Sequence, residues 1–146
     1  MPPMVMFYSD RWENTPAPEA YNEMRGRDLA QWFHARLRDE GYDATAVIEE
    51  DYGFGIEVKL NNYRYWIVVY DMGRDETQRQ QWMISVDVWN GCLKALLPNQ
   101  NPPRALTLRL AETIDQIIRA DDSVQEITWW QDDMYKGTPT PHPPRE

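Results

Sequence analysis

Apolar and polar residues alternate with a period of two through three consecutive runs in the middle of the chain. The runs cover residues 54–60, 63–70 and 82–89, and large apolar side chains stand on both alternating faces of the later two. A period of two predicts β-strands, and short connections between such runs favour antiparallel pairing. An antiparallel sheet commonly exposes one polar face, so a second apolar face predicts a surface that this chain or a partner covers.

A two-residue turn at Asn61-Asn62 sets the register of the first two runs, because asparagine tolerates positive φ better than most residues. In that register Glu57 lies opposite Trp66, and Gly55 lies opposite Val68. A glycine near a large ring leaves room for the ring to lie over the neighbouring strand. The outer face of the predicted sheet therefore combines acids with aromatic rings.

Two segments have the period of amphipathic helices. Residues 28–40 carry one apolar stripe and are followed by Gly41, which suits a left-handed C-terminal cap on which Tyr42 folds back. Residues 101–120 carry a second stripe, and Asn101 followed by two prolines is typical of a helix start.

The remaining segments complete the predicted order of elements. Residues 4–8 form a short edge strand or a tucked arm, 43–51 form a strand, and 124–130 form a final strand. The polar residues 71–81 form a longer loop. The predicted fold class is α+β, with an antiparallel sheet of about four to six strands and two main helices packed on one face.

The domain boundaries follow from length and composition. Residues 1–135 form a single α+β domain, because 146 residues can bury a sufficient core without disulfides or metal. Residues 136–146, KGTPTPHPPRE, are rich in proline. We expect them to form a disordered tail.

Cysteine content and hydropathy favour a cytoplasmic protein. Cys92 is the only cysteine, so no internal disulfide forms and a reducing compartment is the simplest fit. The N-terminal residues lack the pattern of a signal peptide, and no window approaches a transmembrane span. We expect no membrane association.

The net charge of −9 argues against nucleic acid as a partner, since contacts to phosphates need clustered Lys and Arg. Residues 41–90 hold nine acids and four bases, so the sheet region is the acidic part. This charge favours a basic partner, and maintenance of solubility is the alternative explanation.

No catalytic residue, metal site or cofactor is predicted. Cys92 and His34 are the one thiol and imidazole pair of the predicted domain, and no motif surrounds either of them. The acids Glu49, Glu50 and Asp51 lack the spacing of a calcium loop, and no paired histidines or Cys-x-x-Cys accompany them. No glycine-rich segment has the pattern of a phosphate loop.

The acidic and aromatic surface of the sheet is the predicted partner-binding site. Three covers are open for it: the N-terminal arm through residues 4–8, a second copy of the chain, or a different protein. Tryptophan and tyrosine flanked by acids suit a basic partner. The predicted binding residues are Glu49, Glu50, Asp51, Glu57, Trp66, Tyr70, Asp87 and Trp89.

Five segments carry a resemblance to known proteins: residues 27–32 (RDLAQW), 41–42 (GY), 50–54 (EDYGF), 65–67 (YWI) and 124–130 (VQEITWW). Together they resemble small uncharacterised bacterial domains with an acid-Asp-aromatic-Gly-aromatic motif after a first helix. Such domains are similar in size and acidity to immunity proteins that neutralise bacterial toxins. The resemblance implies a non-enzymatic binding role and transfers no catalytic residue.

The expected function is therefore an immunity or inhibitor-type protein that binds a basic protein partner, such as a toxin, through the sheet surface. A homo-oligomeric structural or accessory domain that uses the same surface, for example as a homodimer, is the alternative. An enzyme with an unrecognised site ranks third.

Overall fold

The computed structural model describes residues 3–12, 25–88, 101–131 and 138–145. Within these residues the chain forms two helices and an antiparallel sheet of seven strands, which confirms the α+β class. The strand number exceeds the prediction because residues 43–51 divide into two short strands. In chain order the elements are β1 (Met4–Tyr8), α1 (Arg27–Asp39), β2 (Asp43–Ala44), β3 (Ile48–Glu50), β4 (Gly53–Leu60), β5 (Tyr63–Arg74), β6 (Gln80–Val88), α2 (Arg104–Arg119) and β7 (Gln125–Trp130).

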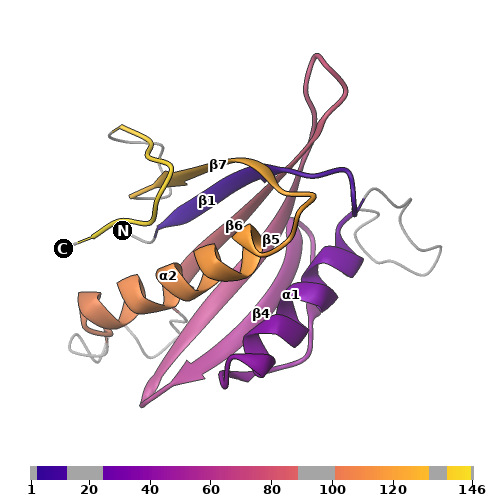
Figure 1. The fold of residues 1–146 in the computed structure, drawn as a ribbon. Helices are drawn as coiled ribbons and strands as arrows, with labels where there is room; N and C mark the ends of the chain where they lie inside the picture. Colours follow the sequence, from indigo (N-terminus) through magenta and orange to yellow (C-terminus); the bar gives the residue numbers. More distant parts are fainter. Residues whose placement is uncertain (1–2, 13–24, 89–100, 132–137, 146) are drawn as a thin grey trace.

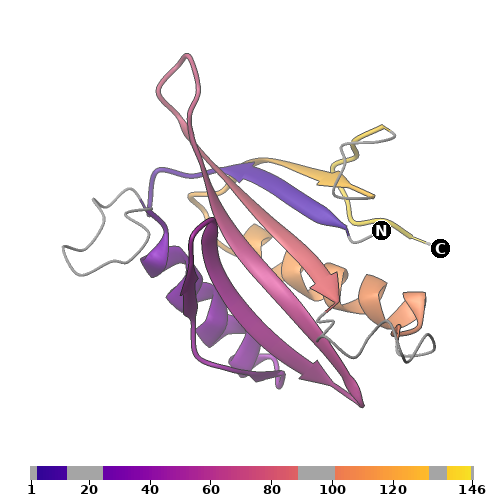
Figure 2. The same cartoon turned by 180° about the vertical axis from the view of Figure 1, so that it is seen from behind.

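The strands follow the order β2-β4-β5-β6-β1-β7, and β3 also pairs with β4. Figure 1 shows α1 and α2 in front of the sheet, and Figure 2 shows the strands in front of both helices. We call the side of the sheet seen in Figure 2 the outer face. The described helices leave this face uncovered in both views.

The N-terminal strand β1 lies inside the sheet. Met4 pairs with Ser85 of β6 on one side and with Trp130 of β7 on the other. The sequence predicted an edge strand or a tucked arm, and both alternatives are wrong because β1 pairs with a strand on each side. Its residues Val5 and Phe7 belong to the core face and are fully buried. The N-terminal arm therefore extends the outer face and does not cover it.

The core lies between the helices and the inner face of the sheet. Val5, Ile67 and Trp82 from the sheet belong to the same buried cluster as Phe33 of α1 and Ile114 of α2. The largest core ring keeps a hydrogen bond, because the Trp82 indole Nε1 donates to the Ser9 carbonyl oxygen at 3.0 Å. Buried indoles that keep a hydrogen bond avoid a desolvation penalty.

The Tyr65 hydroxyl lies 2.9 Å from the Thr107 hydroxyl and so connects β5 to α2. Burial raises the pKa of Tyr65 above its ordinary value, because removal from water disfavours the phenolate. The neutral hydroxyl is the form that bridges the sheet and the helix.

The predicted C-terminal cap of the first helix is confirmed. Gly41 has a φ of 91°, its amide donates to the Arg38 carbonyl, and the Tyr42 amide donates to the Leu37 carbonyl. This is the paired bonding of a Schellman motif. The start of α2 differs from prediction: Pro103 occupies the N-cap position in place of Asn101, and no side chain caps the helix.

The β4–β5 register agrees with the prediction at each of its paired positions. Glu57 lies opposite Trp66 and Gly55 opposite Val68. Asn61 has a φ of 56° in the connecting turn. The alternation of side chains therefore identified correctly which residues share a face.

The predicted loop at residues 71–81 is wrong. β5 continues to Arg74, β6 begins at Gln80, and the two strands form the hairpin that projects beyond the sheet in Figure 1. The Asp75 carboxylate closes the turn, since its Oδ1 accepts from the Thr77 hydroxyl at 2.7 Å and from the amides of Thr77 and Arg79. These hydrogen bonds, first of all the one from the Thr77 hydroxyl, lower the pKa of Asp75 to about 2.

The C-terminal residues 138–145 pack against the domain, whereas the sequence predicted a tail without packing. Thr140 forms an isolated antiparallel bridge with Trp129 of β7, and Pro144 is buried. Proline-rich composition removes backbone donors, but the carbonyls and the apolar rings remain available for contacts.

Phe7→Ala should lower the free energy of unfolding by about 3–5 kcal/mol, because β1 buries this ring completely inside the core. Met6→Ala is the matched control on the opposite face of the same strand and should cost about 1 kcal/mol or less. Urea denaturation measures both values. Equal and small losses would show that β1 is a loosely attached arm.

The hairpin tip should lose its hydrogen-bonded turn as the pH falls from about 4 to about 2. The folded-state pKa of Asp75 lies below its ordinary value of 3.8, so its contribution is present above that value and disappears as the pH falls through about 2. Amide chemical shifts of Thr77 and Arg79 follow the change. Asp75→Asn, which does not titrate, should remove this transition, and an unchanged transition in that variant would contradict the assignment.

Candidate functional site

Four of the five residues predicted from the three central strands share the outer face. Glu57, Trp66 and Asp87 form one row across β4, β5 and β6, since each lies directly opposite the next. Tyr70 stands further along β5, opposite Met83. Trp89, the fifth residue predicted for this surface, lies outside the described residues.

The acid cluster before β4 divides between the two faces. Glu49 lies opposite the core residue Phe54 and forms an ion pair with Arg27 of α1, so it belongs to the helix side of the sheet. Glu50 lies opposite Gly53 and faces outward. Asp51 is exposed in the turn that follows. The structure therefore brings Glu50 and Asp51 to the outer face and separates Glu49 from them.

Trp66 covers the centre of the outer face. Its indole lies so close to Gly55 that a β-carbon there would overlap the ring. Val68, on the same face of β5, is 1% exposed. A glycine of β4 thus leaves room for a large ring of β5, as predicted: Trp66 lies over Gly55. The centre of this face is an internal packing layer, and accessible apolar surface must lie elsewhere.

Among the described residues, three large apolar side chains are exposed: Met72 in the projecting part of β5, and Ile48 and Tyr52 at the edge of the sheet near the β3–β4 turn. Ile48 is 45% exposed and Tyr52 is 46% exposed. The ring of Tyr52 lies 6.1 Å from the ring of Tyr70 at an interplanar angle of 31°, a tilted aromatic pair. We call this surface the edge patch; it consists of Ile48, Glu50, Asp51, Tyr52 and Tyr70.

The sequence missed Ile48 and Tyr52. Successive side chains of a strand point to opposite faces, and Glu49 of β3 lies on the helix side. Its neighbour Ile48 must therefore point outward, but this direction is known only once the bounds of β3 are known. Tyr52 lies in a turn, where alternation gives no direction. The sequence feature that could have identified Tyr52 is its position directly after the acids Glu49, Glu50 and Asp51.

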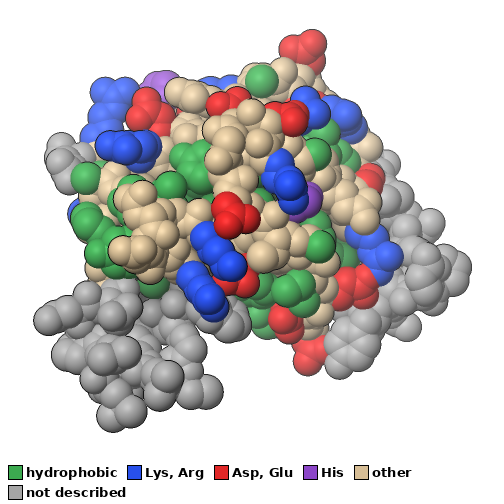
Figure 3. All heavy atoms as spheres, turned by 90° about the horizontal axis from the view of Figure 1, so that it is seen from below, with side chains coloured by type: hydrophobic (Ala, Val, Ile, Leu, Met, Phe, Trp, Pro, Cys, Tyr) green, Lys and Arg blue, Asp and Glu red, His purple; other side chains and the backbone are tan. Residues whose placement is uncertain are grey.

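Ion pairs neutralise part of the predicted acidic surface. The Glu57 Oε1 atom lies 3.4 Å from the Arg64 Nε atom, and the Glu57 amide donates to the Thr45 hydroxyl. In the space-filling view of Figure 3, basic and acidic side chains are interspersed on the face seen from below. Because Glu57 is paired with Arg64, the exposed Asp51 is the stronger candidate for an acid that meets the partner.

The candidates for catalysis and metal binding gain no support. His34 Nε2 lies 3.2 Å from the Ala44 carbonyl oxygen, which fixes its ring at the α1–β2 junction. Cys92 lies outside the described residues. Among the described residues, no group of three or more His, Cys, Asp or Glu side chains is placed to hold a metal ion. Within the same part of the chain, no helix has the length and apolar character of a membrane span.

Gly55→Ala should lower the free energy of unfolding by about 1–3 kcal/mol, because the new β-carbon meets the Trp66 indole. In a Trp66→Ala background the same substitution should cost much less, since the three nearest atoms all belong to that ring. Gly53→Ala is the matched control, because its β-carbon meets the Val69 backbone carbonyl. Its cost should persist in both backgrounds, and equal behaviour of the two glycines would contradict the role of Trp66.

In comparisons with known proteins, no family model, curated protein or solved structure matches the chain. Any function must therefore be inferred from the fold and the side chains of this chain.

Proposed function

We propose that this protein is a non-enzymatic binding domain of the immunity or inhibitor type, located in the cytoplasm, which docks a basic protein partner on the edge patch. The observation that carries the proposal is the exposure of Ile48 and Tyr52, each nearly half accessible, beside the acids Glu50 and Asp51. Large apolar side chains next to charged ones are typical of a protein-binding surface.

The two kinds of side chain contribute to binding in different ways. Tyrosine is enriched among residues that dominate binding energy, and Tyr52 offers both a ring and a hydroxyl. The adjacent acids attract a basic protein before contact and so raise the association rate. The Tyr52–Tyr70 pair supplies a preformed surface, which reduces the entropy lost on binding.

A homodimer through the same patch is the second candidate, because Ile48 and Tyr52 can pack against their own copies. A two-fold interface places the same surface of two copies face to face. The acids Glu50 and Asp51 of both copies would then lie in one interface. Like charges at short distance oppose association, so the charge of the patch favours a basic partner over a second copy.

Tyr52→Ala should weaken binding of the protein encoded by the neighbouring gene by about 30-fold or more, the loss expected for a tyrosine hot spot. An immunity role predicts that this neighbour is the toxin. Asp51→Asn should mainly lower the association rate, and the effect should shrink as salt is added. Biolayer interferometry measures the rates of association and dissociation separately.

Glu76→Gln is the control for charge, because Glu76 is an exposed acid at the tip of the projecting hairpin. It should leave both rates unchanged. Binding that survives Tyr52→Ala and Asp51→Asn would exclude the edge patch. Failure of the neighbouring product to bind would remove the immunity role, and a concentration-dependent dimer in light scattering that Tyr52→Ala abolishes would favour the homodimer.

A further inference from the structure

The C-terminal residues 138–145, with the sequence TPTPHPPR, lie along α2 beside the edge strand β7. The Thr140 amide donates to the Trp129 carbonyl oxygen at 3.0 Å, and the Trp129 amide donates to the Thr140 carbonyl oxygen at 2.6 Å. Pro144 is buried although most of its neighbours in the segment are exposed. Three kinds of contact therefore hold the segment: the two-bond bridge to Trp129, a hydrogen bond from Arg119 to the Pro141 carbonyl oxygen, and the buried ring of Pro144.

A buried carboxylate organises the groups that hold this segment. Asp115 of α2 is 7% exposed, and its Oδ2 atom accepts from Arg119 Nε at 2.8 Å. Its Oδ1 atom accepts from the Trp129 indole Nε1 at 2.8 Å. The Arg119 guanidinium in turn donates to the Pro141 carbonyl oxygen. Asp115 thus positions both residues, Arg119 and Trp129, that form hydrogen bonds with the backbone of the segment.

The contacts are ones that an extended proline-rich segment can make through its backbone. Proline-rich segments are extended, their carbonyls are free, and their preformed conformation loses little entropy on binding. The described hydrogen bonds from the domain to the segment go to backbone atoms of Thr140 and Pro141. These contacts therefore hold an extended backbone at Thr140 and Pro141, and a buried proline ring follows at Pro144.

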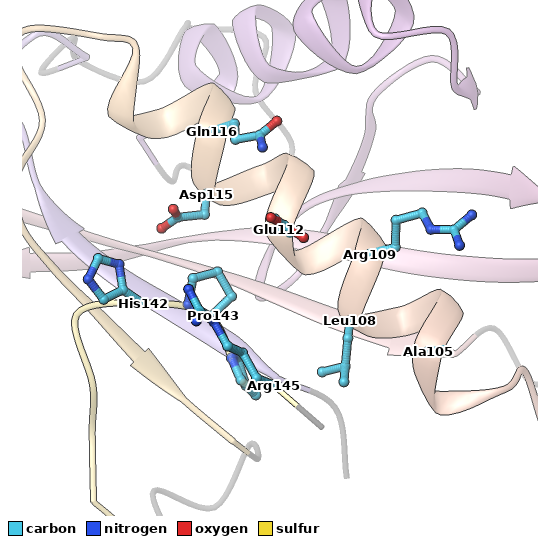
Figure 4. A pocket seen from close by; sticks show the side chains of 10 residues that line it. Ala105, Leu108, Arg109, Glu112, Asp115, Gln116, His142, Pro143 and Arg145 are labelled. Atoms are coloured by element: carbon cyan, nitrogen blue, oxygen red, sulfur yellow. The ribbon is translucent and has the colours of Figure 1, made fainter.

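The segment does not fill the space beside it. A cavity of about 410 Å³ lies between α2 and the segment. In Figure 4, Leu108 and Asp115 project from the helix toward the side on which His142, Pro143 and Arg145 lie. Cavities of a few hundred Å³ are typical of binding sites. The groove therefore has room for an occupant larger than the resident segment.

We propose that α2 and β7 form a groove that binds an extended proline-rich segment of a partner protein, and that residues 138–145 occupy this groove as an intramolecular competitor. The partner segment carries a residue with a backbone amide before its prolines, as Thr140 does, and a basic residue after them. Arg145 holds that last position and lines the cavity together with Glu112 of α2. This groove is separate from the edge patch.

The test must weaken the resident segment, because tethering gives it an effective concentration in the millimolar range. In the full chain, Pro144→Asp places a charge at a buried position and so releases the segment. A fluorescent peptide with the sequence of residues 138–145 should then bind at least about tenfold more tightly than to the natural chain. Pro139→Asp is the matched control, since Pro139 is exposed, and it should behave like the natural chain. Fluorescence anisotropy measures the dissociation constants.

Thr140→Pro provides a second releasing variant, because it deletes the amide that donates to Trp129 and changes no residue of the core. Circular dichroism establishes that each variant is folded. Binding of the peptide by both folded releasing variants supports the proposal. The proposal is overturned if neither binds it, or if a peptide with aspartate at the position of Pro144 binds equally well.

Asp115→Asn in the releasing background tests the role of the buried carboxylate as a positioning group. It keeps an acceptor for the Trp129 indole and removes the charge that orients Arg119, so the peptide affinity should fall about tenfold. Asp122→Asn is the control, because Asp122 is an exposed acid just beyond α2. Unchanged affinity in Asp115→Asn, or an equal loss in Asp122→Asn, would overturn this arrangement.

Discussion

The insertion of β1 between β6 and β7 is the pairing on which the other features depend. The strands β4, β5 and β6 form a continuous meander, but β7 reaches the sheet in the described structure through β1 alone. Trp129 of β7 is held in the core by this pairing, and its indole then meets Asp115 of α2. The groove that holds residues 138–145 therefore exists because β1 pairs with β6 on one side and with β7 on the other.

Ion pairs between distant elements distribute the charge of the molecule. Arg27 of α1 contacts Glu49 of β3, and Arg11 contacts Asp121 after α2. Burial would raise the pKa of Asp121, but hydrogen bonds from Ser123 and the charge of Arg11 outweigh it and hold the pKa below its ordinary value. The arginines of these ion pairs thus join separate elements of the fold, and the chain as a whole keeps more acids than bases. A net charge of −9 is therefore compatible with a face on which both signs are interspersed.

Local patterns predicted local features of the fold, and they failed where distant pairing decides. The alternation of side chains located Glu57, Trp66 and Asp87 on one face, because period two fixes direction whatever the neighbouring strand is. It could not place β1, since a five-residue run has the same pattern inside a sheet and at its edge. The projecting hairpin was missed because its strands extend beyond the core and need no apolar side. The edge patch was half predicted: its acids and Tyr70 were found, whereas Tyr52 lies in a turn.

The position of β1 also has a consequence for synthesis of the chain. The hydroxyls of Ser9 and Ser123, which follow β1 and precede β7, lie 2.7 Å apart although 114 residues separate them in sequence. β1 emerges from the ribosome before either of its partner strands exists. Pairings between distant segments form slowly, and exposed strand edges invite association with other chains. We therefore expect insertion of β1 to be a late step of folding, until which this apolar strand is exposed to association with other chains.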